Sequence, residues 1–217
     1  MPDDFWKSGI SFYIDGTSFV HKTNPFDQAR ATKSMAWRKR GEGLALHCTS
    51  KGKKAGVEGR TAHLFVSIAY NKGVIACDQY FQRMNGESFS EYVRLNFPQI
   101  FAKSANSIVM RFLQDGDPVQ NSALAKRAFK DVGALVFSIP PRSPDLNPIE
   151  NLFHLVSKQL EEDALEMEIK YEDFGQFSKR VKDTIMNFPK NTIDKIIESM
   201  NKRVVTIIKN RGQRLKY

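Results

Sequence analysis

The first residues combine aromatic, β-branched and polar positions in a short run. Residues 9–15 read GISFYID, and Gly16 follows them. This pattern predicts a β-strand that ends in the carboxylate of Asp15. Two further apolar runs, 61–70 and 74–81, flank an Asn-Lys-Gly sequence that is typical of a hairpin turn. We therefore expect three antiparallel strands at the start of the fold.

Helical and extended patterns alternate along the rest of the chain. A strand over 108–113 leads into Asp115, and a helix before it, over 88–103, is interrupted or bent by Pro98. The other expected elements are a helix over 122–131, a strand over 134–139, and helices over about 148–163, 171–188 and 192–209. The apolar face of the last helix is expected to pack in the core. This order predicts an α/β fold, an RNase H-like mixed sheet flanked by helices.

The composition of the chain favours a folded domain and gives no sign of a membrane span. Of the 217 residues, 41% are hydrophobic, which is enough for a folded domain. No run of about 18 apolar residues exists and the amino terminus has no signal-peptide pattern, so a soluble intracellular protein is expected. Cys48 and Cys77 show neither zinc nor disulfide spacing and are expected to be packing residues.

Basic residues exceed acidic ones, and many of them gather in one segment. The chain has 33 Lys and Arg against 24 Asp and Glu, a formal charge of +9, which favours a polyanionic partner. Residues from about 17 to 60 are basic and punctuated by glycine, so they are expected to form a long functional loop insertion.

Three carboxylates stand where the expected elements would bring them together. Asp15 and Asp115 end strands that are neighbours in this type of sheet, and their mutual repulsion would be relieved by a divalent cation. Glu150 lies in the first turn of a helix that Asn147 can cap and Pro148 can begin. Taken singly, each carboxylate is more often a turn former or a complement to the helix dipole. Two further aspartates, Asp117 and Asp145, are interpreted as turn and loop residues.

Three segments around these carboxylates resemble the acidic motifs of the mariner superfamily of DDE/D transposases, in its Tc-like branch. They are FYIDGTSF at 12–19, FLQDGDPVQNS at 112–122 and SPDLNPIENLF at 143–153, and 34 residues separate Asp115 from Glu150. The segments SMAWRKRGE at 34–42 and IIESMNKRVVTIIKNRG at 196–212 are also similar to that family.

The resemblance implies an RNase H-like catalytic domain over 1–217 that cuts transposon ends and joins them to target DNA, with TA targets. It implies Asp15, Asp115 and Glu150 as catalytic residues and as ligands of two Mg²⁺ ions, for which Mn²⁺ can substitute. It further implies a homodimer on DNA, a nuclear location and helices over about 165–217. The basic loop would touch DNA, with candidate contacts at Arg38, Lys39, Arg40, Lys51, Lys53 and Lys54.

Two features depart from the family pattern. Val119 and Gln120 stand where relatives commonly have Lys-His, which affects DNA contacts rather than metal ligands. Relatives also carry amino-terminal helix-turn-helix modules, which are expected to be absent because this sequence begins close to its first strand. Two alternative functions remain open: a nuclease of the same fold that only hydrolyses, and a domesticated transposase remnant that binds DNA or protein without activity.

Overall fold

One mixed sheet organises the molecule. The computed structural model describes residues 4–30, 60–81, 84–104, 106–140 and 143–210, and within them five strands run in the order β3-β2-β1-β4-β5. Strand β1 pairs antiparallel with β2 and parallel with β4, and β5 continues the parallel half. The strands are β1 Phe12–Val20, β2 Thr61–Ala69, β3 Gly73–Tyr80, β4 Arg111–Gln114 and β5 Leu135–Ser138. The mixed sheet expected from the element order is therefore present.

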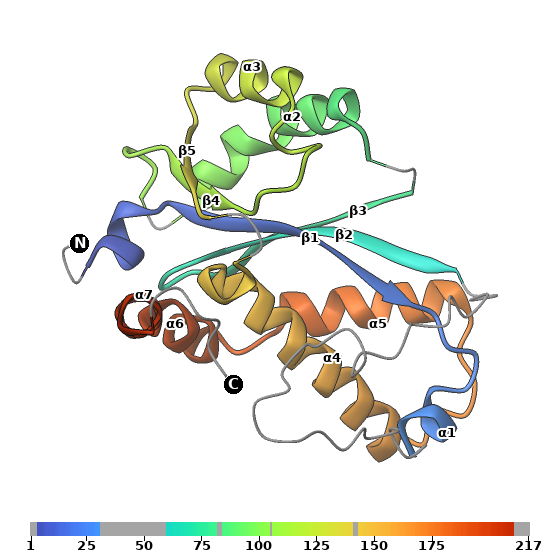
Figure 1. Ribbon diagram of the computed structural model, residues 1–217. Helices are drawn as coiled ribbons and strands as arrows, with labels where there is room; N and C mark the ends of the chain where they lie inside the picture. Colours follow the sequence, from blue (N-terminus) through green and yellow to red (C-terminus); the bar gives the residue numbers. More distant parts are fainter. Residues whose placement is uncertain (1–3, 31–59, 82–83, 105, 141–142, 211–217) are drawn as a thin grey trace, which may run out of the picture.

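Helices cover both faces of this sheet. Helices α2 and α3 lie on one face, and α4 to α7 lie on the other, with α1 beside the far end of α4 (Figure 1). Their bounds are α1 Pro25–Arg30, α2 Gly86–Lys103, α3 Ala123–Asp131, α4 Pro148–Glu166, α5 Phe174–Met186, α6 Lys190–Glu198 and α7 Met200–Lys209. A π-helical turn, Phe5–Gly9, precedes β1, and a 3-10 turn, Pro144–Leu146, precedes α4.

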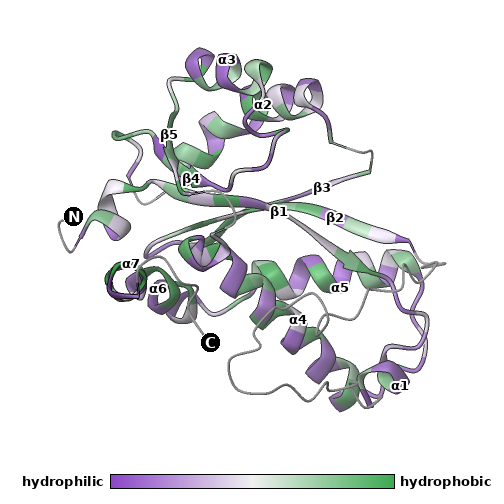
Figure 2. Cartoon of the chain, viewed as in Figure 1, coloured by the Kyte–Doolittle hydropathy of each residue, from purple (hydrophilic) through white to green (hydrophobic). Residues whose placement is uncertain are grey.

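Alternation along β1 divides the core into two layers. Phe12 and Ile14 pack with α2 and α3, whereas Tyr13 and Phe19 pack with the helices of the opposite face. Since side chains alternate between faces of a strand, Asp15 points to the same side as Tyr13. The helices carry both apolar and polar residues, as expected for helices with one buried face (Figure 2).

Two expectations from composition concern the cysteines and membrane-spanning segments. Cys77 lies buried in the core, which confirms it as a packing residue, while Cys48 lies outside the described residues. Across the described part of the chain, the helices are too short or too polar for any of them to cross a membrane.

The first strand is longer than predicted. We expected it to end at Asp15 and a loop to begin at about residue 17, but β1 continues to Val20 and α1 follows at Pro25. The prediction was wrong because Gly16 does not stop the strand: β2 pairs with every residue from Tyr13 to Val20. Gly16 lies opposite Phe65, where an added Cβ would lie 3.4 Å from Phe65 Cε1.

Other elements also shift from their predicted bounds. The hairpin of β2 and β3 is confirmed, with Asn71 and Gly73 at positive φ in its turn. Helix α2 runs past Pro98 without ending there. Strand β4 begins at Arg111, three residues later than expected, because Met110 has a positive φ of 50°.

The single helix expected over 192–209 is two helices. Helix α6 ends at Glu198, and α7 begins at Met200. Met200 and Arg203 of α7 are buried and Val204 packs against the core, while Val205 and Ile208 are exposed, so the expected apolar core face reaches only the first part of α7. Periodicity alone did not show this break, because apolar residues continue at helical spacing through it.

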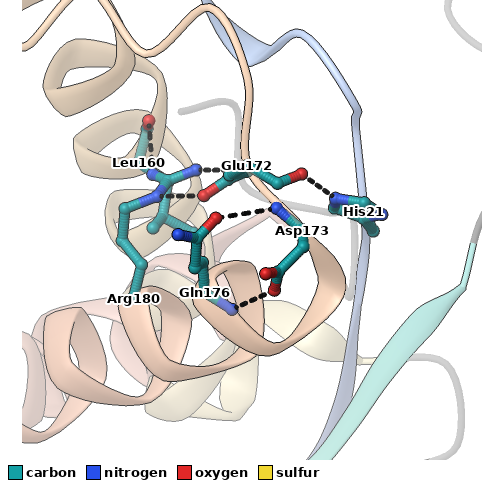
Figure 3. A network of polar contacts seen from close by, with 6 residues as sticks. All are labelled: His21, Leu160, Glu172, Asp173, Gln176 and Arg180. Atoms are coloured by element: carbon teal, nitrogen blue, oxygen red, sulfur yellow. Dashed lines mark hydrogen bonds and ion pairs between the residues drawn. The ribbon is translucent and has the colours of Figure 1, made fainter.

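A buried ion pair fixes α5 against α4 and the end of β1. Arg180 donates to both carboxylate oxygens of Glu172, at 2.5 and 2.9 Å, and to the Leu160 carbonyl at 3.2 Å (Figure 3). His21 Nε2 donates to the Glu172 carbonyl at 2.8 Å, and a capping box joins Asp173 with Gln176 at the start of α5. This network ties three segments that are distant in the sequence.

We expect Glu172→Gln to lower the free energy of unfolding by about 3 kcal/mol, because it leaves the largely buried Arg180 guanidinium without its ionic partner. The Glu172 side chain is only 5% exposed. Urea denaturation measures the change. Glu162→Gln is the control, because Glu162 pairs with Lys158 on the surface, where such a pair contributes less than about 1 kcal/mol. Equal losses in the two variants would contradict a structural role for the buried pair.

Candidate active site

Strand register places Asp15 level with Asp115. The parallel ladder between β1 and β4 pairs Phe12 with Phe112 and Tyr13 with Leu113. Asp15 and Asp115 each lie two residues after the last of these pairs, Asp15 within β1 and Asp115 just after the end of β4. Neighbouring strands thus present two carboxylates at one point of the sheet. The expectation that Asp115 follows a strand is confirmed, whereas Asp15 lies inside its strand rather than at its end.

The third carboxylate comes from the start of α4. Helix α4 begins at Pro148, so Glu150 lies in its first turn, as the sequence predicted. The turn before the helix contacts β1 through the side chain of Asn147. All three carboxylates line one cavity of about 460 Å³. The structure therefore brings Asp15, Asp115 and Glu150 to the same site from three separate segments.

Burial and like charge disfavour the ionised form of these carboxylates. Burial, together with the negative charges of Asp115 and Glu150, raises the pKa of Asp15 to about 8. Hydrogen bonds from the Gly16 backbone and the Gln120 side chain act in the opposite direction. Burial also raises the pKa of Asp115 and that of Glu150, and the Asp115 charge adds to the shift at Glu150. Such a site attracts a cation, which would relieve the repulsion.

A tight turn after β4 fixes Asp115. The Asp115 Oδ1 atom accepts the Asp117 N–H at 3.0 Å, and Asp117 Oδ1 accepts the Val119 N–H at 2.7 Å. The interpretation of Asp117 as a turn former is confirmed. Asp145 lies in the 3-10 turn before α4 and is buried, which agrees with its interpretation as a loop residue.

The expected role of Asn147 was wrong. Asn147 occupies the cap position of α4 but makes no side-chain capping bond. Its Nδ2 atom instead donates to Asp15 Oδ2 at 3.0 Å. Capping is a local rule, and the attraction of a buried carboxylate 132 residues away outweighs it here.

Sequence reasoning also missed several residues that line the cavity. Val119 and Gln120, which depart from the family pattern, both line it, and Gln120 bonds to Asp15. Four aromatic side chains line the same cavity: His63, Phe65, Tyr80 and Phe81. His63 and Phe65 alternate in the sequence of β2, but only the register, which pairs Phe65 with Gly16 and His63 with Tyr80, shows that this group lies next to the strand of Asp15.

The carboxylates surround an open site. Within the described part of the chain, no group of three or more His, Cys, Asp or Glu side chains has an arrangement that could hold a metal ion. Mg²⁺ commonly binds through one or two carboxylates and completes its coordination with water and substrate phosphates. The six basic residues expected to touch DNA, from Arg38 to Lys54, lie outside the described residues.

A family model described as DDE superfamily endonuclease matches residues 21–169, which is more than half of the chain. The chain belongs to the DDE superfamily endonuclease family. The matched range contains Asp115 and Glu150, while Asp15 lies shortly before it. The family resemblance inferred from the three acidic motifs is therefore confirmed.

Two curated relatives of this DDE superfamily endonuclease come from nematodes. The Tcb2 transposase of Caenorhabditis briggsae is 30% identical over 117 residues, which cover 54% of this chain and 41% of that protein. The Tc3 transposase of Caenorhabditis elegans is 24% identical over 135 residues, which cover 62% and 40%. The chain thus matches about two fifths of the length of each relative.

Solved structures of the Mos1 transposase share the fold. Its catalytic domain aligns with a TM-score of 0.62 at 13% identity, covering 94% of this chain and 84% of that one. The Mos1 strand transfer complex aligns with a TM-score of 0.67 at 15% identity, covering 94% and 55%. The Mos1 paired-end complex with Mg gives 0.68 at 14% identity, covering 94% and 56%. These likenesses confirm the RNase H-like fold class that the element order predicted.

Proposed function

We propose that this chain is the catalytic domain of a cut-and-paste DNA transposase, which cleaves transposon ends and joins them to target DNA. The observation that carries the proposal is the convergence of Asp15, Asp115 and Glu150 on one cavity, in a chain of the DDE superfamily endonuclease family. The curated relatives are both transposases, and Mos1 has been solved as a strand transfer complex.

The residues of the site fit a divalent cation. The three carboxylates offer only oxygen ligands, which hard cations prefer, and their shared burial and repulsion favour a bound positive charge. Asp15, Asp115 and Glu150 would hold Mg²⁺ or Mn²⁺, with two ions per site as part of the proposal. Mos1 structures with Mg and with Mn support this choice. When bound, such ions activate a nucleophile and stabilise charge on the phosphate that is attacked.

The protein's contribution is a rigid arrangement of carboxylates. Asp15 is held inside a strand that pairs along its length, and Asp115 is held by the turn that Asp117 forms. Glu150 is fixed by its place in the first turn of α4. Cleavage and joining are both in-line displacements at phosphorus and differ only in the nucleophile, water or a DNA 3′-hydroxyl. One site can therefore carry out both reactions.

The partners in this proposal are transposon-end DNA and target DNA, bound by a homodimer in the nucleus. The formal charge of +9 supports a polyanionic partner. A paired-end complex of Mos1 with its left transposon end supports the paired arrangement.

We expect DNA binding by this chain to weaken steeply with salt. Each neutralised phosphate adds about 0.9 to the log–log slope, so changing the six basic candidates between Arg38 and Lys54 to alanine should reduce it by up to about 5. Fluorescence anisotropy at salt concentrations from roughly 50 to 200 mM, over which phosphate contacts change DNA affinity strongly, measures the slope. Alanine at Lys158 and Lys179, which pair with acids on exposed helices, should leave it almost unchanged. An unchanged slope in the variant with all six substitutions would mean that the DNA contacts lie elsewhere.

The proposed activity is tested with labelled transposon-end DNA that carries a pre-cut 3′-hydroxyl, incubated with target DNA and Mn²⁺. Joined products are expected with the natural sequence and not with Asp115→Asn. Hydrolysis without joining would make the chain a nuclease of the same fold. DNA binding without either reaction would make it a domesticated remnant, and both outcomes contradict the proposal.

A further inference from the structure

The side chain of Asn147 forms a hydrogen bond with Asp15. Asn147 is completely buried, and its backbone is extended, with φ −109° and ψ 106°. Its amide donates to Asp15 Oδ2 at 3.0 Å and not to the backbone of the helix that it precedes. Asparagine is a strong helix-capping residue, but here its side chain bonds to a distant carboxylate instead of capping α4.

This bond completes the hold on the Asp15 carboxylate. The Gly16 N–H donates to Oδ1 at 2.7 Å, while Asn147 donates to Oδ2. The Gln120 side chain also bonds to this carboxylate. Because an ionised carboxylate offers about four acceptor positions, one position remains for a further ligand. Two donors from different segments fix both the position and the rotation of the group.

The turn that carries Asn147 is itself anchored from α7. Arg203, which is buried, donates through Nη1 to the Asp145 carbonyl at 3.3 Å and to Asn151 Oδ1 at 2.5 Å. These two partners lie on either side of Asn147 and Glu150 in the sequence. A single guanidinium therefore restrains the segment that brings both side chains to β1.

We propose that Asn147 is a positioning residue, whose amide orients the Asp15 carboxylate so that it can share a divalent cation with Asp115 and Glu150. The inference rests on the proposed function, because it assumes that these carboxylates bind metal. Groups that orient metal ligands commonly change metal affinity by about 10- to 100-fold when they are removed.

If Asn147 served only to stabilise the fold, replacing it would lower the stability of the metal-free protein rather than its affinity for Mn²⁺. Asn147 Oδ1 is buried and has no hydrogen-bond partner within the described part of the chain. The unpartnered Oδ1 lowers stability and the Nδ2 bond to Asp15 raises it, so replacing the amide by an apolar group of similar shape should change the stability of the metal-free fold only slightly. Asn147→Leu is thus expected to separate metal binding from stability.

The test is a titration of the chain with Mn²⁺ in the absence of DNA, with free Mn²⁺ followed by electron paramagnetic resonance. Asn147→Leu should bind Mn²⁺ about 10- to 100-fold more weakly than the natural sequence. Its urea midpoint without metal should stay close to that of the natural sequence. Asn96→Leu is the matched control, because Asn96 donates to the Tyr92 carbonyl on α2 and does not line the cavity.

Each outcome decides the inference. Unchanged Mn²⁺ affinity in Asn147→Leu, in a protein whose affinity falls in Asp15→Asn, would overturn the positioning role alone. Mn²⁺ affinity that Asp15→Asn does not lower would instead contradict the proposed metal site. If Asn147→Leu unfolds, Asn147→Ser and Asn147→Ala replace it: the serine, which keeps a donor, should bind Mn²⁺ more tightly, and equal affinities would overturn the inference.

Discussion

Replacing Glu150 by glutamine is expected to reduce Mn²⁺-dependent DNA cleavage and joining by about 10³-fold or more. The substitution keeps the shape of the side chain but removes one of the three charges around the cavity. Metal ions contribute several kcal/mol of charge stabilisation to phosphoryl transfer, and each 1.36 kcal/mol is about a factor of ten in rate. Single-turnover assays on transposon-end DNA measure the loss.

Two variants control for folding in this experiment. Glu162→Gln makes the same chemical change on an exposed position of α4 and should keep normal activity. Asp145→Asn changes a buried residue of the turn before α4, so any effect should appear in thermal melting rather than in the rate per folded molecule. Near-normal activity of Glu150→Gln would mean that Glu150 only complements the helix dipole and that the third ligand lies elsewhere.

The second large effect is a stability that depends on pH through Asp15. Its pKa rises from an ordinary value of 3.8 to about 8 in the folded protein without metal. Between these values the folded state binds a proton that the unfolded state releases, so rising pH destabilises the fold, by at most about 1.4 kcal/mol per pH unit from this group. Asp15→Asn removes this contribution and should become progressively more stable than the natural sequence as pH rises from 5 to 8.

Urea unfolding in the presence of a chelator, at several pH values, measures this difference. Asp131→Asn, at an exposed residue that pairs with Arg94, should give a curve parallel to that of the natural sequence. Parallel curves for Asp15→Asn as well would show that Asp15 is ionised in the folded state. With Mn²⁺ the direction reverses, because a metal must displace the Asp15 proton, so Mn²⁺ affinity should increase with pH up to about 8.

Local patterns predicted much of the fold and the three carboxylates. The hairpin turn at Asn71, the helix that Ser122 caps and the first-turn position of Glu150 all follow from short-range rules, and the structure confirms them. Each of these features depends on residues within a few positions of one another.

Features that depend on distant partners were not predictable in this way. Gly16 looks like the end of a strand until β2 is seen to pair with it. Asn147 looks like a helix cap until its bond to Asp15 is known. The break at Ser199 is hidden by continuing apolar residues, and Arg203 shows its role only through the turn that it anchors. In each case tertiary contacts outweigh the local preference.

The proposed metal site is tested by diffraction from crystals soaked in Mn²⁺, recorded for its anomalous signal. Mn²⁺ is expected in contact with Asp15 and Asp115 and close to Glu150, with two ions roughly 3.5–4 Å apart when DNA is bound. Mn²⁺ bound only elsewhere would contradict the proposed site. So would carboxyl groups of Asp15 and Asp115 that stay more than about 8 Å apart, because ligand distances near 2.0–2.6 Å do not allow them to share an ion.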